Sequence, residues 1–387
     1  MVPTVTIGAR GESRLRDGHV WIYRADVADV RASAGDLVRV LGPRGRVLGC
    51  ALYSDRSQIV LRLFSPGEGM ADLSVWRERI QAALAFRDSL AIQATAYRLV
   101  HAEADLLPSL VVDRYADWLV VQALSQAVDR LLPDLVRILV ELTGAAGVLA
   151  RNDPRVRLLE GLDRHVALVH GNVPPQVLVR EGDIEYEADL WRGQKTGLFL
   201  DQRENRAAAA AYARGRLLDC FTYNGGFVLQ LARACAQATA IDVSEDAIAR
   251  VRANAARNGL AHVETVSANV FDELRRREKA GERYDTIVLD PPAFAPNKAS
   301  VPRALAGYRE INLRALRLLE RGGCLVTCSC SYNVDEATFG QVLHEAALDA
   351  HARVTVLEKR MQARDHPVLL GVPETYYLKC LILRRIG

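Results

Sequence analysis

The second half of the chain alternates short apolar runs with amphipathic stretches. The apolar runs are typical of strands and lie at residues 217–219, 238–242, 263–266, 286–290 and 324–328. Helical periodicity separates them: Ile248, Val251 and Ala255 share one face of a predicted helix over residues 246–258, and Gly259 stops it. This alternation predicts an α/β fold with a doubly wound, mostly parallel sheet, whose ligands bind at the carboxyl ends of the strands.

The first half of the chain has a different pattern. Apolar runs at residues 38–40, 47–52 and 59–63 are separated by Gly, Pro, Ser and Asp, which predicts a small all-β unit between residues 5 and 64. Residues 65–69 are typical of a linker, a helix is predicted over 73–90, and an α/β mixture continues to a second boundary at residues 172–175. We therefore expect three domains, at residues 1–68, 72–172 and 178–387.

Composition narrows the class of protein. Half of the 387 residues are hydrophobic and 25% are charged, as in ordinary globular proteins. No apolar run approaches the ~20 residues that span a bilayer, and the first residues lack the apolar core of a signal peptide, so we expect a cytoplasmic protein without membrane contact. The seven cysteines include no Cys-x-x-Cys pair, so neither a disulfide framework nor a metal site is expected. A net charge of +3 does not by itself indicate nucleic acid.

Polar residues follow the predicted strands at the edge where a ligand would bind. A glycine-rich turn comes after the first strand, and Asp242 ends the second, where a carboxylate can accept hydrogen bonds from both ribose hydroxyls. Ser244 is predicted to cap the next helix, and Asn269 follows the third strand, where it can face an adenine ring. A glycine-rich turn alone is also typical of any strand-to-helix connection, but the three features together indicate a nucleotide cofactor. The turn supplies Asp219, Phe221, Tyr223, Asn224 and Gly225.

The fourth strand ends in Asp290, followed by two prolines, an alanine and Phe294. Consecutive prolines fix φ and hold a loop extended, which would keep the Asp290 carboxylate directed toward a substrate. The chain lacks a Gly-x-Gly-x-x-Gly sequence in this region, which argues against a nicotinamide enzyme.

These motifs resemble those of the class I methyltransferases, which use S-adenosylmethionine. Residues 193–203 resemble more narrowly the large-subunit (23S) ribosomal RNA cytosine-5 methyltransferases that carry an N-terminal PUA domain, and the likeness covers nearly the whole chain. The resemblance implies a PUA-like β-barrel that binds RNA, a Rossmann-like catalytic domain, ribosomal RNA as partner and a homodimer. It also implies that Lys195, Gln202 and Arg203 line the cofactor pocket. Further matches are residues 18–23, 103–108, 112–115, 308–312, 329–331 and 365–367.

Methylation of carbon 5 of cytosine needs a nucleophile, because C5 becomes reactive only when a thiolate adds to C6. The resemblance gives this role to Cys330, with Asp290 holding the base near N3. We expect the fifth strand to begin right after Gly323, so that Cys324 lies at the wrong end and Cys328 within the apolar run, while Cys330 lies beyond it. Many RNA cytosine-5 methyltransferases carry a second cysteine where this chain has Ala293, and the base that removes the C5 proton is not identified.

Two alternatives stay open at this point. Asp-Pro-Pro motifs also occur in methyltransferases that act on exocyclic amines and need no cysteine, and a non-catalytic RNA-binding protein could keep the same fold. Loss of activity in a Cys330 variant would distinguish the cytosine-5 enzyme from the amine-methylating one. A titration with the cofactor would distinguish an enzyme from a non-catalytic RNA-binding protein.

Overall fold

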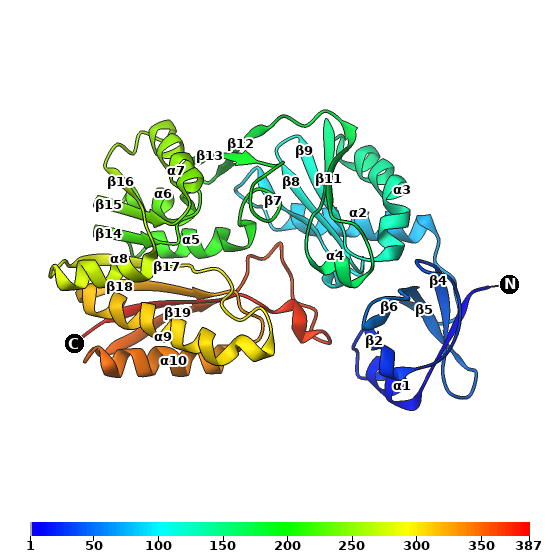
Figure 1. Ribbon diagram of the computed structural model, residues 1–387. Coiled ribbons are helices and arrows are strands. Elements are labelled where there is room, and N and C mark those ends of the chain that lie inside the picture. Colours follow the sequence, from blue (N-terminus) through cyan, green and yellow to red (C-terminus); the bar gives the residue numbers. More distant parts are fainter. Residues whose placement is uncertain (1) are drawn as a thin grey trace. The chain divides into compact units, whose positions relative to one another are not determined.

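The computed structural model describes residues 2–387, which divide into two compact units, each described here by itself. The first unit contains the chain up to Arg180 with Ala188–Leu200 and Arg364–Thr375, and the second contains Glu181–Glu187, Asp201–Ala363 and Tyr376–Gly387. Figure 1 labels the helices and strands. The segments Ala188–Leu200 and Arg364–Thr375 therefore fold with the N-terminal part of the chain, while the three-domain division at residues 1–68, 72–172 and 178–387 stays a prediction.

The N-terminal strands of the first unit form a six-stranded sheet in the order β2-β6-β5-β4-β1-β3. The three runs predicted as strands are present as β4, β5 and β6. The predicted linker was wrong in its first two residues, because Ser65 and Pro66 still pair with Cys50 and Gly49 of β5. The elements are β1 (Thr4–Ile7), α1 (Ala9–Arg16), β2 (Trp21–Tyr23), η1 (Arg24–Asp26), β3 (Val27–Arg31), β4 (Leu37–Leu41), β5 (Val47–Tyr53) and β6 (Ile59–Pro66).

A second sheet of the first unit has five strands in the order β11-β10-β9-β8-β7, with β9 and β10 parallel and the other pairs antiparallel. The helix predicted over residues 73–90 is α2. The elements are α2 (Leu73–Ser89), β7 (Ala96–His101), η2 (Ala102–Asp105), β8 (Leu110–Tyr115), β9 (Trp118–Ala123), α3 (Gln126–Thr143), β10 (Gly147–Asn152), α4 (Val156–Leu159) and β11 (His165–Gly171). A two-stranded sheet of β12 (Gln176–Glu181) and β13 (Ile184–Asp189) follows.

One buried hydrophobic cluster joins the two larger sheets of the first unit, and the N-terminal sheet also has a separate core of its own. Leu52 and Phe64 of the N-terminal sheet belong to the same buried cluster as Trp76 and Ile80 of α2. The rings of Phe64 and Trp76 stack with their centroids 4.6 Å apart. Removal of the N-terminal sheet would therefore expose large apolar side chains to water.

The second unit is built on a seven-stranded sheet in the order β16-β15-β14-β17-β18-β20-β19. Strands β14 to β18 are parallel, and β20 is antiparallel to both of its neighbours. The chain winds outward from β14 to β16 and returns to β17, so that β14 and β17 flank the topological switch point, where such sheets bind ligands. This confirms the predicted doubly wound α/β fold. The strands are β14 (Gly215–Cys220), β15 (Cys235–Asp242), β16 (Val263–Ser267), β17 (Tyr284–Leu289), β18 (Leu319–Ser329), β19 (Val354–Arg360) and β20 (Lys379–Arg385).

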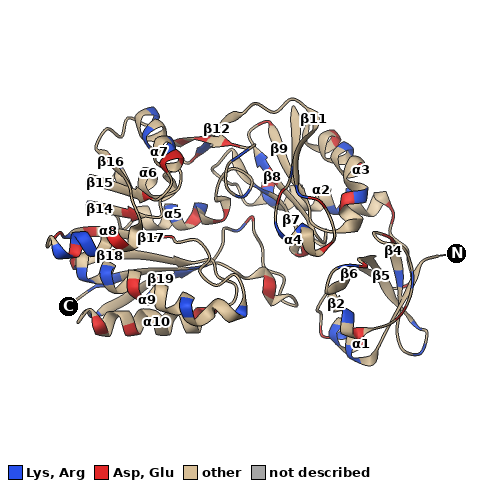
Figure 2. Ribbon diagram, in the orientation of Figure 1, with Lys and Arg blue, Asp and Glu red and all other residues tan. Residues whose placement is uncertain are grey.

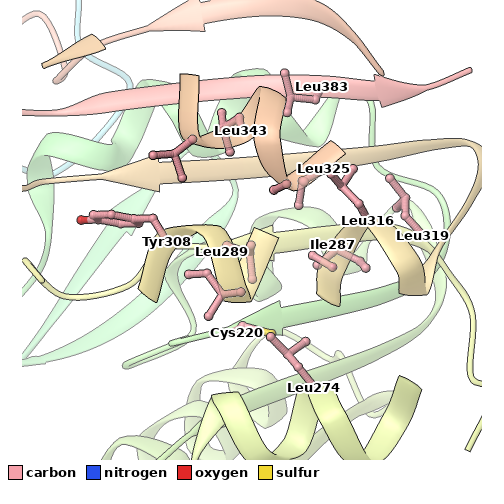
Figure 3. Close-up of a cluster of buried hydrophobic side chains, with 14 of the residues drawn as sticks. Cys220, Leu274, Ile287, Leu289, Tyr308, Leu316, Leu319, Leu325, Leu343 and Leu383 are labelled. Carbon is pink, nitrogen blue, oxygen red and sulfur yellow. The ribbon is translucent and has the colours of Figure 1, made fainter. Parts of the chain in front are cut away.

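Helices cover this sheet, and Figure 3 shows the apolar cluster beneath three of them, α8, α9 and α10. Leu274 of α8, Leu316 of α9 and Leu343 of α10 all belong to it, together with Ile287 and Leu325 of the central strands. The helices and short 3-10 turns are η3 (Leu200–Gln202), α5 (Arg203–Ala210), α6 (Gly226–Ala232), α7 (Glu245–Arg257), α8 (Val270–Lys279), η4 (Lys298–Ser300), α9 (Val301–Leu318), α10 (Glu336–Asp349) and η5 (Pro373–Thr375).

The charged residues of α8 follow the helix dipole. Helix α8 carries Asp272 and Glu273 in its first turn and Arg276, Arg277 and Lys279 in its last, as the colouring of Figure 2 illustrates. Within residues 2–387 no helix is long and apolar enough to cross a membrane.

Strand β18 begins earlier than predicted. The expected start after Gly323 was wrong, because pairing with β17 already begins at Leu319 and shifts register before Cys324. Gly323 lies inside the strand at a point where a Cβ atom would come within 2.9 Å of the carbonyl oxygens of Asp285 and Glu320. The glycine thus permits a close backbone approach within the strand rather than marking its start.

Candidate active site

The loop after β14 is held by a buried carboxylate. Oδ2 of Asp219 accepts hydrogen bonds from the Thr222 hydroxyl at 2.6 Å and from the Val228 N–H at 3.0 Å. The backbone between these contacts is tightly wound, with positive φ at Phe221 (63°) and Tyr223 (52°). Since such φ values are costly for residues other than glycine, the loop has a strained conformation of the kind found at functional sites.

Asp219 is also the most unusual acid of the site. The residue is 1% exposed, and its Oδ1 has no hydrogen-bond partner among residues 2–387. The pKa of Asp219 is raised to about 7, chiefly by burial; the hydrogen bonds from Thr222 and Val228 oppose the rise, and the carboxylates of Asp290 and Asp242 contribute to it. A buried acceptor without a partner is suited to a donor or a positive charge supplied by a ligand.

The second and third loops carry the other predicted cofactor residues. Asp242 joins two loops, because its carboxylate accepts from the Tyr223 N–H at 2.9 Å and from the Ser244 N–H at 3.0 Å. Ser244 caps α7 through the Ala247 N–H, as predicted. Asn269 is exposed, and its side-chain oxygen caps α8. Its amide N–H₂ group is therefore the part of the side chain that can donate to a ligand.

A cluster of aromatic rings connects these loops to the next ones. Half-buried Phe221 packs edge-on against Phe271 and Phe294, with centroids 6.5 and 6.3 Å apart. Phe294, at the end of the Asp-Pro-Pro segment, continues the contact to Tyr308 at 4.8 Å. The rings form an apolar wall that joins the loops after β14 and β17 to the start of α8 and to α9.

The loop after β17 is anchored from η3 and the start of α5. The Gln202 amide donates to Oδ1 of half-buried Asp290 at 2.9 Å, and Asn205 donates in turn to Oε1 of Gln202 at 2.6 Å. The structure thus brings Gln202 and Asp290 together, and it adds Asn205, which the sequence did not indicate. Arg203 is buried beside them and pairs with Glu204 at 3.1 Å.

Lys195 does not belong to the second unit. It lies in the first unit, where its ammonium group is 4.5 Å from the centre of the Phe199 ring. Much of the matching segment over residues 193–203 is fixed there, because Thr196 donates to buried Asp113 at 2.6 Å and the Leu198 N–H donates to the Tyr115 hydroxyl at 3.0 Å.

Asp113 belongs to a buried polar network of the first unit. It pairs with Arg98 through Nε at 2.5 Å, and the Arg98 N–H donates to Asp365 at 2.8 Å. The Arg87 guanidinium donates to the Asp365 carbonyl at 2.7 Å and pairs with Asp105 at 2.5 Å. The network therefore gives the matching segments at residues 103–108, 112–115 and 365–367 a shared structural role that sequence position did not reveal.

The three cysteines near the end of β18 have different environments. Cys324 and Cys328 are buried in the strand, and burial raises the pKa of the Cys324 thiol to about 12 and that of Cys328 well above its ordinary value. Cys330 lies just beyond the strand, is half-buried, and its sulfur is 3.8 Å from the Pro291 carbonyl oxygen. The other six cysteines of the chain are all buried.

The backbone around Cys330 is fixed by two buried serines. Ser329 and Ser331 both hydrogen-bond the Tyr308 hydroxyl, at 3.0 and 2.9 Å, and the Ser331 hydroxyl also accepts from the Ala295 N–H at 3.0 Å. The loops after β17 and β18 are therefore joined, with Cys330 between the two anchors. These contacts give a structural role to the serines of residues 329–331 and to the tyrosine of residues 308–312, which the sequence identified only as matches to the family.

Comparisons with known proteins agree with this architecture. Residues 5–66 match a PUA-like domain, and residues 97–384 match S-adenosylmethionine-dependent methyltransferases. The chain is 39% identical over 397 aligned positions, covering 100% of both chains, to a Tolumonas auensis protein named ribosomal RNA large subunit methyltransferase I. A Shewanella denitrificans protein of the same name is 40% identical, with 96% of this chain and 97% of the relative covered.

Solved structures show the same fold. A methyltransferase crystallised with SAH aligns with a TM-score of 0.86 and 23% identity, and 100% of both chains is covered. A Streptococcus mutans protein described as a SAM-dependent methyltransferase aligns with a TM-score of 0.85 and 22% identity, also with 100% of both chains covered. At these identities the likeness concerns the fold alone.

Proposed function

The chain belongs to the S-adenosylmethionine-dependent methyltransferases, and from this premise we propose that it forms 5-methylcytosine in large-subunit ribosomal RNA, with Cys330 as nucleophile. The relatives that it matches over its full length are named for methylation of that RNA. The single observation that carries the cytosine assignment is the position of Cys330. Among the cysteines within residues 2–387 it is the one that is not fully buried, and it lies against Pro291, the residue after Asp290.

The residues present fit the cofactor. S-adenosylmethionine supplies a methyl group on a positively charged sulfur, and the loops after β14 and β15 place the carboxylates of Asp219 and Asp242 in one region, one of them with an orphaned buried oxygen. We infer that Asp242 binds the ribose hydroxyls and that Asn269 faces the adenine. The other proposed contacts are Lys195, Gln202, Arg203, Asp219, Phe221, Tyr223, Asn224, Gly225, Ser244 and Asp290.

Cys330 performs the covalent part of the proposed reaction. Its thiolate adds to C6 of the cytosine, which breaks the C5–C6 double bond and makes C5 nucleophilic. C5 then takes up the methyl group, a base removes the C5 proton, and the bond between Sγ and C6 breaks to restore the ring and the thiolate. Each step leaves Cys330 unchanged at the end, as a catalyst requires.

Asp290 has the proposed role of holding the base at N3. Its carboxylate is fixed by Gln202 through Oδ1, while two prolines hold the following backbone extended. Thiolate addition at C6 develops negative charge on N3, where the carboxyl group of Asp290 in its acid form can donate a proton; the proton returns to Asp290 when the thiolate leaves. Its neighbour on the next loop is Cys330, so one base can meet both groups.

The N-terminal sheet is the proposed RNA-binding part. It coincides with the PUA-like match and shares a core with the central sheet, so it is held firmly within the first unit. PUA-type contacts to RNA rely on shape and on phosphates. A homodimer stays a prediction, which sedimentation analysis would test.

The experiment that tests this function identifies the methylated nucleoside. Ribosomal RNA from a strain lacking the protein is incubated with the purified enzyme and S-adenosylmethionine, digested, and analysed by mass spectrometry against nucleoside standards. We expect 5-methylcytidine to appear with wild-type enzyme and not with Cys330→Ala. A nucleoside methylated on an exocyclic amine, formed equally by both proteins, would establish the alternative reaction instead.

A further inference from the structure

A buried lysine lies beside the Cys330 loop. Lys379 is the first residue of β20 and pairs with Ser329 across the antiparallel ladder with β18. Its side chain crosses into the interior, where the residue is only 2% exposed. Lysine is almost never fully buried unless its charge has a partner, so this position needs an explanation.

The hydrogen bonds of Lys379 fix the loop but do not neutralise the charge. Nζ donates to the Ser331 carbonyl at 2.7 Å and to the Tyr377 carbonyl at 2.9 Å. Both acceptors are uncharged, and an ammonium group has a third N–H. The contact to Ser331 holds the residue directly after Cys330, so the lysine controls the position of the nucleophile's own backbone.

The negative groups that favour the charged lysine are Cys330, as thiolate, and Asp335. The Asp335 carboxylate already caps α10 by accepting from the Thr338 N–H at 2.7 Å. Burial lowers the pKa of Lys379 to about 8, and both anions raise it. At pH 7 the ammonium form therefore predominates, and by reciprocity it favours the thiolate of Cys330.

The other titratable groups near Cys330 cannot replace this cation. Tyr308 is buried, which raises its pKa, so it stays neutral. Cys328 stays a thiol because its pKa lies well above the ordinary value, and the Asp290 carboxylate opposes a second negative charge. Cys380, on β20, pairs with Cys328 and is also buried. Lys379 is the cation among these neighbours.

We propose that Lys379 is a positioning residue of the active site, whose ammonium group holds the Cys330 loop and stabilises the Cys330 thiolate. The catalytic purpose of this interaction rests on the proposed function, but the effect of Lys379 on the ionisation of Cys330 can be measured without RNA. It explains why a charged residue occupies the buried first position of β20, directly before the apolar run at residues 380–383.

The test measures how fast iodoacetamide alkylates Cys330 as a function of pH, with the Cys330 peptide quantified by mass spectrometry. Six cysteines are buried, so alkylation of the folded protein reports mainly on Cys330. The wild-type midpoint should lie below the ~8.5 of an unperturbed cysteine. Lys379→Met should raise the midpoint by about one pH unit or more, while Lys379→Arg, which keeps the charge, should stay near wild type.

The matched control is Lys359→Met. Lys359 lies on β19, and its side chain is 62% exposed in an ion pair with Glu336, so the midpoint should not move. In methylation assays, activity of Lys379→Met should fall at neutral pH and recover toward pH 9, because high pH forms the thiolate without help. A merely structural lysine would give a loss that pH does not restore.

An unchanged midpoint in a folded Lys379→Met protein would overturn the proposal. A wild-type midpoint above ~8.5 would do so as well, even if the methionine variant does not fold. Neither result concerns the reaction on RNA, so the proposed function would still be decided separately by mass spectrometry of the methylated nucleoside.

Discussion

The two sides of the candidate active site use opposite charges. On the cofactor side, the loops after β14 and β15 are held by the carboxylates of Asp219 and Asp242, which accept backbone N–H groups. On the substrate side, the loop after β18 is held by neutral hydroxyls and by the buried ammonium of Lys379. Carboxylates suit a cofactor with a positive sulfur, while a cation suits a thiolate.

This difference separates two kinds of mutational effect. Changes on the cofactor side should weaken binding of S-adenosylmethionine, and changes on the substrate side should lower turnover while leaving that binding intact. Asp290 belongs to both sides, since its carboxylate raises the pKa of Asp219 and also that of Cys328.

The largest effect is expected for Cys330→Ala. Loss of the nucleophile should lower methylation by roughly a thousandfold or more, with unchanged affinity for S-adenosylmethionine in calorimetry. Cys324→Ala and Cys328→Ala are the matched controls and should retain much activity, because both thiols are buried in β18. Activity that disappears in Cys328→Ala and survives in Cys330→Ala would show that the wrong sulfur has been assigned.

Asp290→Asn should have the next largest effect. Loss of the acid that donates a proton to N3 should lower kcat by about a hundredfold, and the affinity for S-adenosylmethionine should change less, since the amide oxygen can still accept from Gln202. Steady-state kinetics with saturating cofactor measures this. A variant with normal kcat and only a raised KM for the cofactor would place Asp290 on the cofactor side alone.

Asp242→Ala should chiefly affect binding. A charge-assisted hydrogen bond contributes ~1.5–3 kcal/mol, so loss of the ribose acceptor should weaken S-adenosylmethionine by about tenfold or more. Glu245→Ala, at an exposed position in the first turn of α7, is the control. Unchanged affinity by calorimetry would remove Asp242 from the cofactor site.

The smallest effect is a pH dependence from Asp219. Its pKa of about 7 means that the folded protein binds a proton there which the unfolded chain releases near pH 4, so this group's contribution to stability falls as pH rises from about 4 to 7. The positive cofactor favours the carboxylate, so affinity should rise severalfold between pH 6 and pH 8 and then level off. Calorimetry should detect proton release on cofactor binding near pH 7. Asp219→Asn should abolish both the proton release and the pH dependence of the affinity. A wild-type affinity that does not depend on pH would contradict this account.

The sequence predicted well those features that depend on local pattern. The parallel strands, the helix capped by Ser244 and the position of Cys330 beyond its strand all follow from periodicity and from residues close together in the chain. The start of β18 was missed because the pairing of Leu319 depends on its neighbour strand and on a glycine inside the strand rather than before it.

Contacts between distant segments could not be predicted. The segment with Thr196 is fixed by Asp113 and Tyr115, about eighty residues earlier in the chain. Lys379 reaches the Cys330 loop only because β20 is antiparallel to β18. A lysine directly before the apolar run at residues 380–383 was the signal available in the sequence, and it indicates burial without identifying the partner.

The most direct test of the covalent mechanism uses RNA that contains 5-fluorocytosine. Fluorine cannot leave C5 as a proton would, so the bond between Cys330 and C6 should persist after methyl transfer and give a complex that survives denaturing electrophoresis. We predict trapping with wild type and with Cys328→Ala, and none with Cys330→Ala. Absence of trapping in wild type, together with full methylation by Cys330→Ala, would contradict the account.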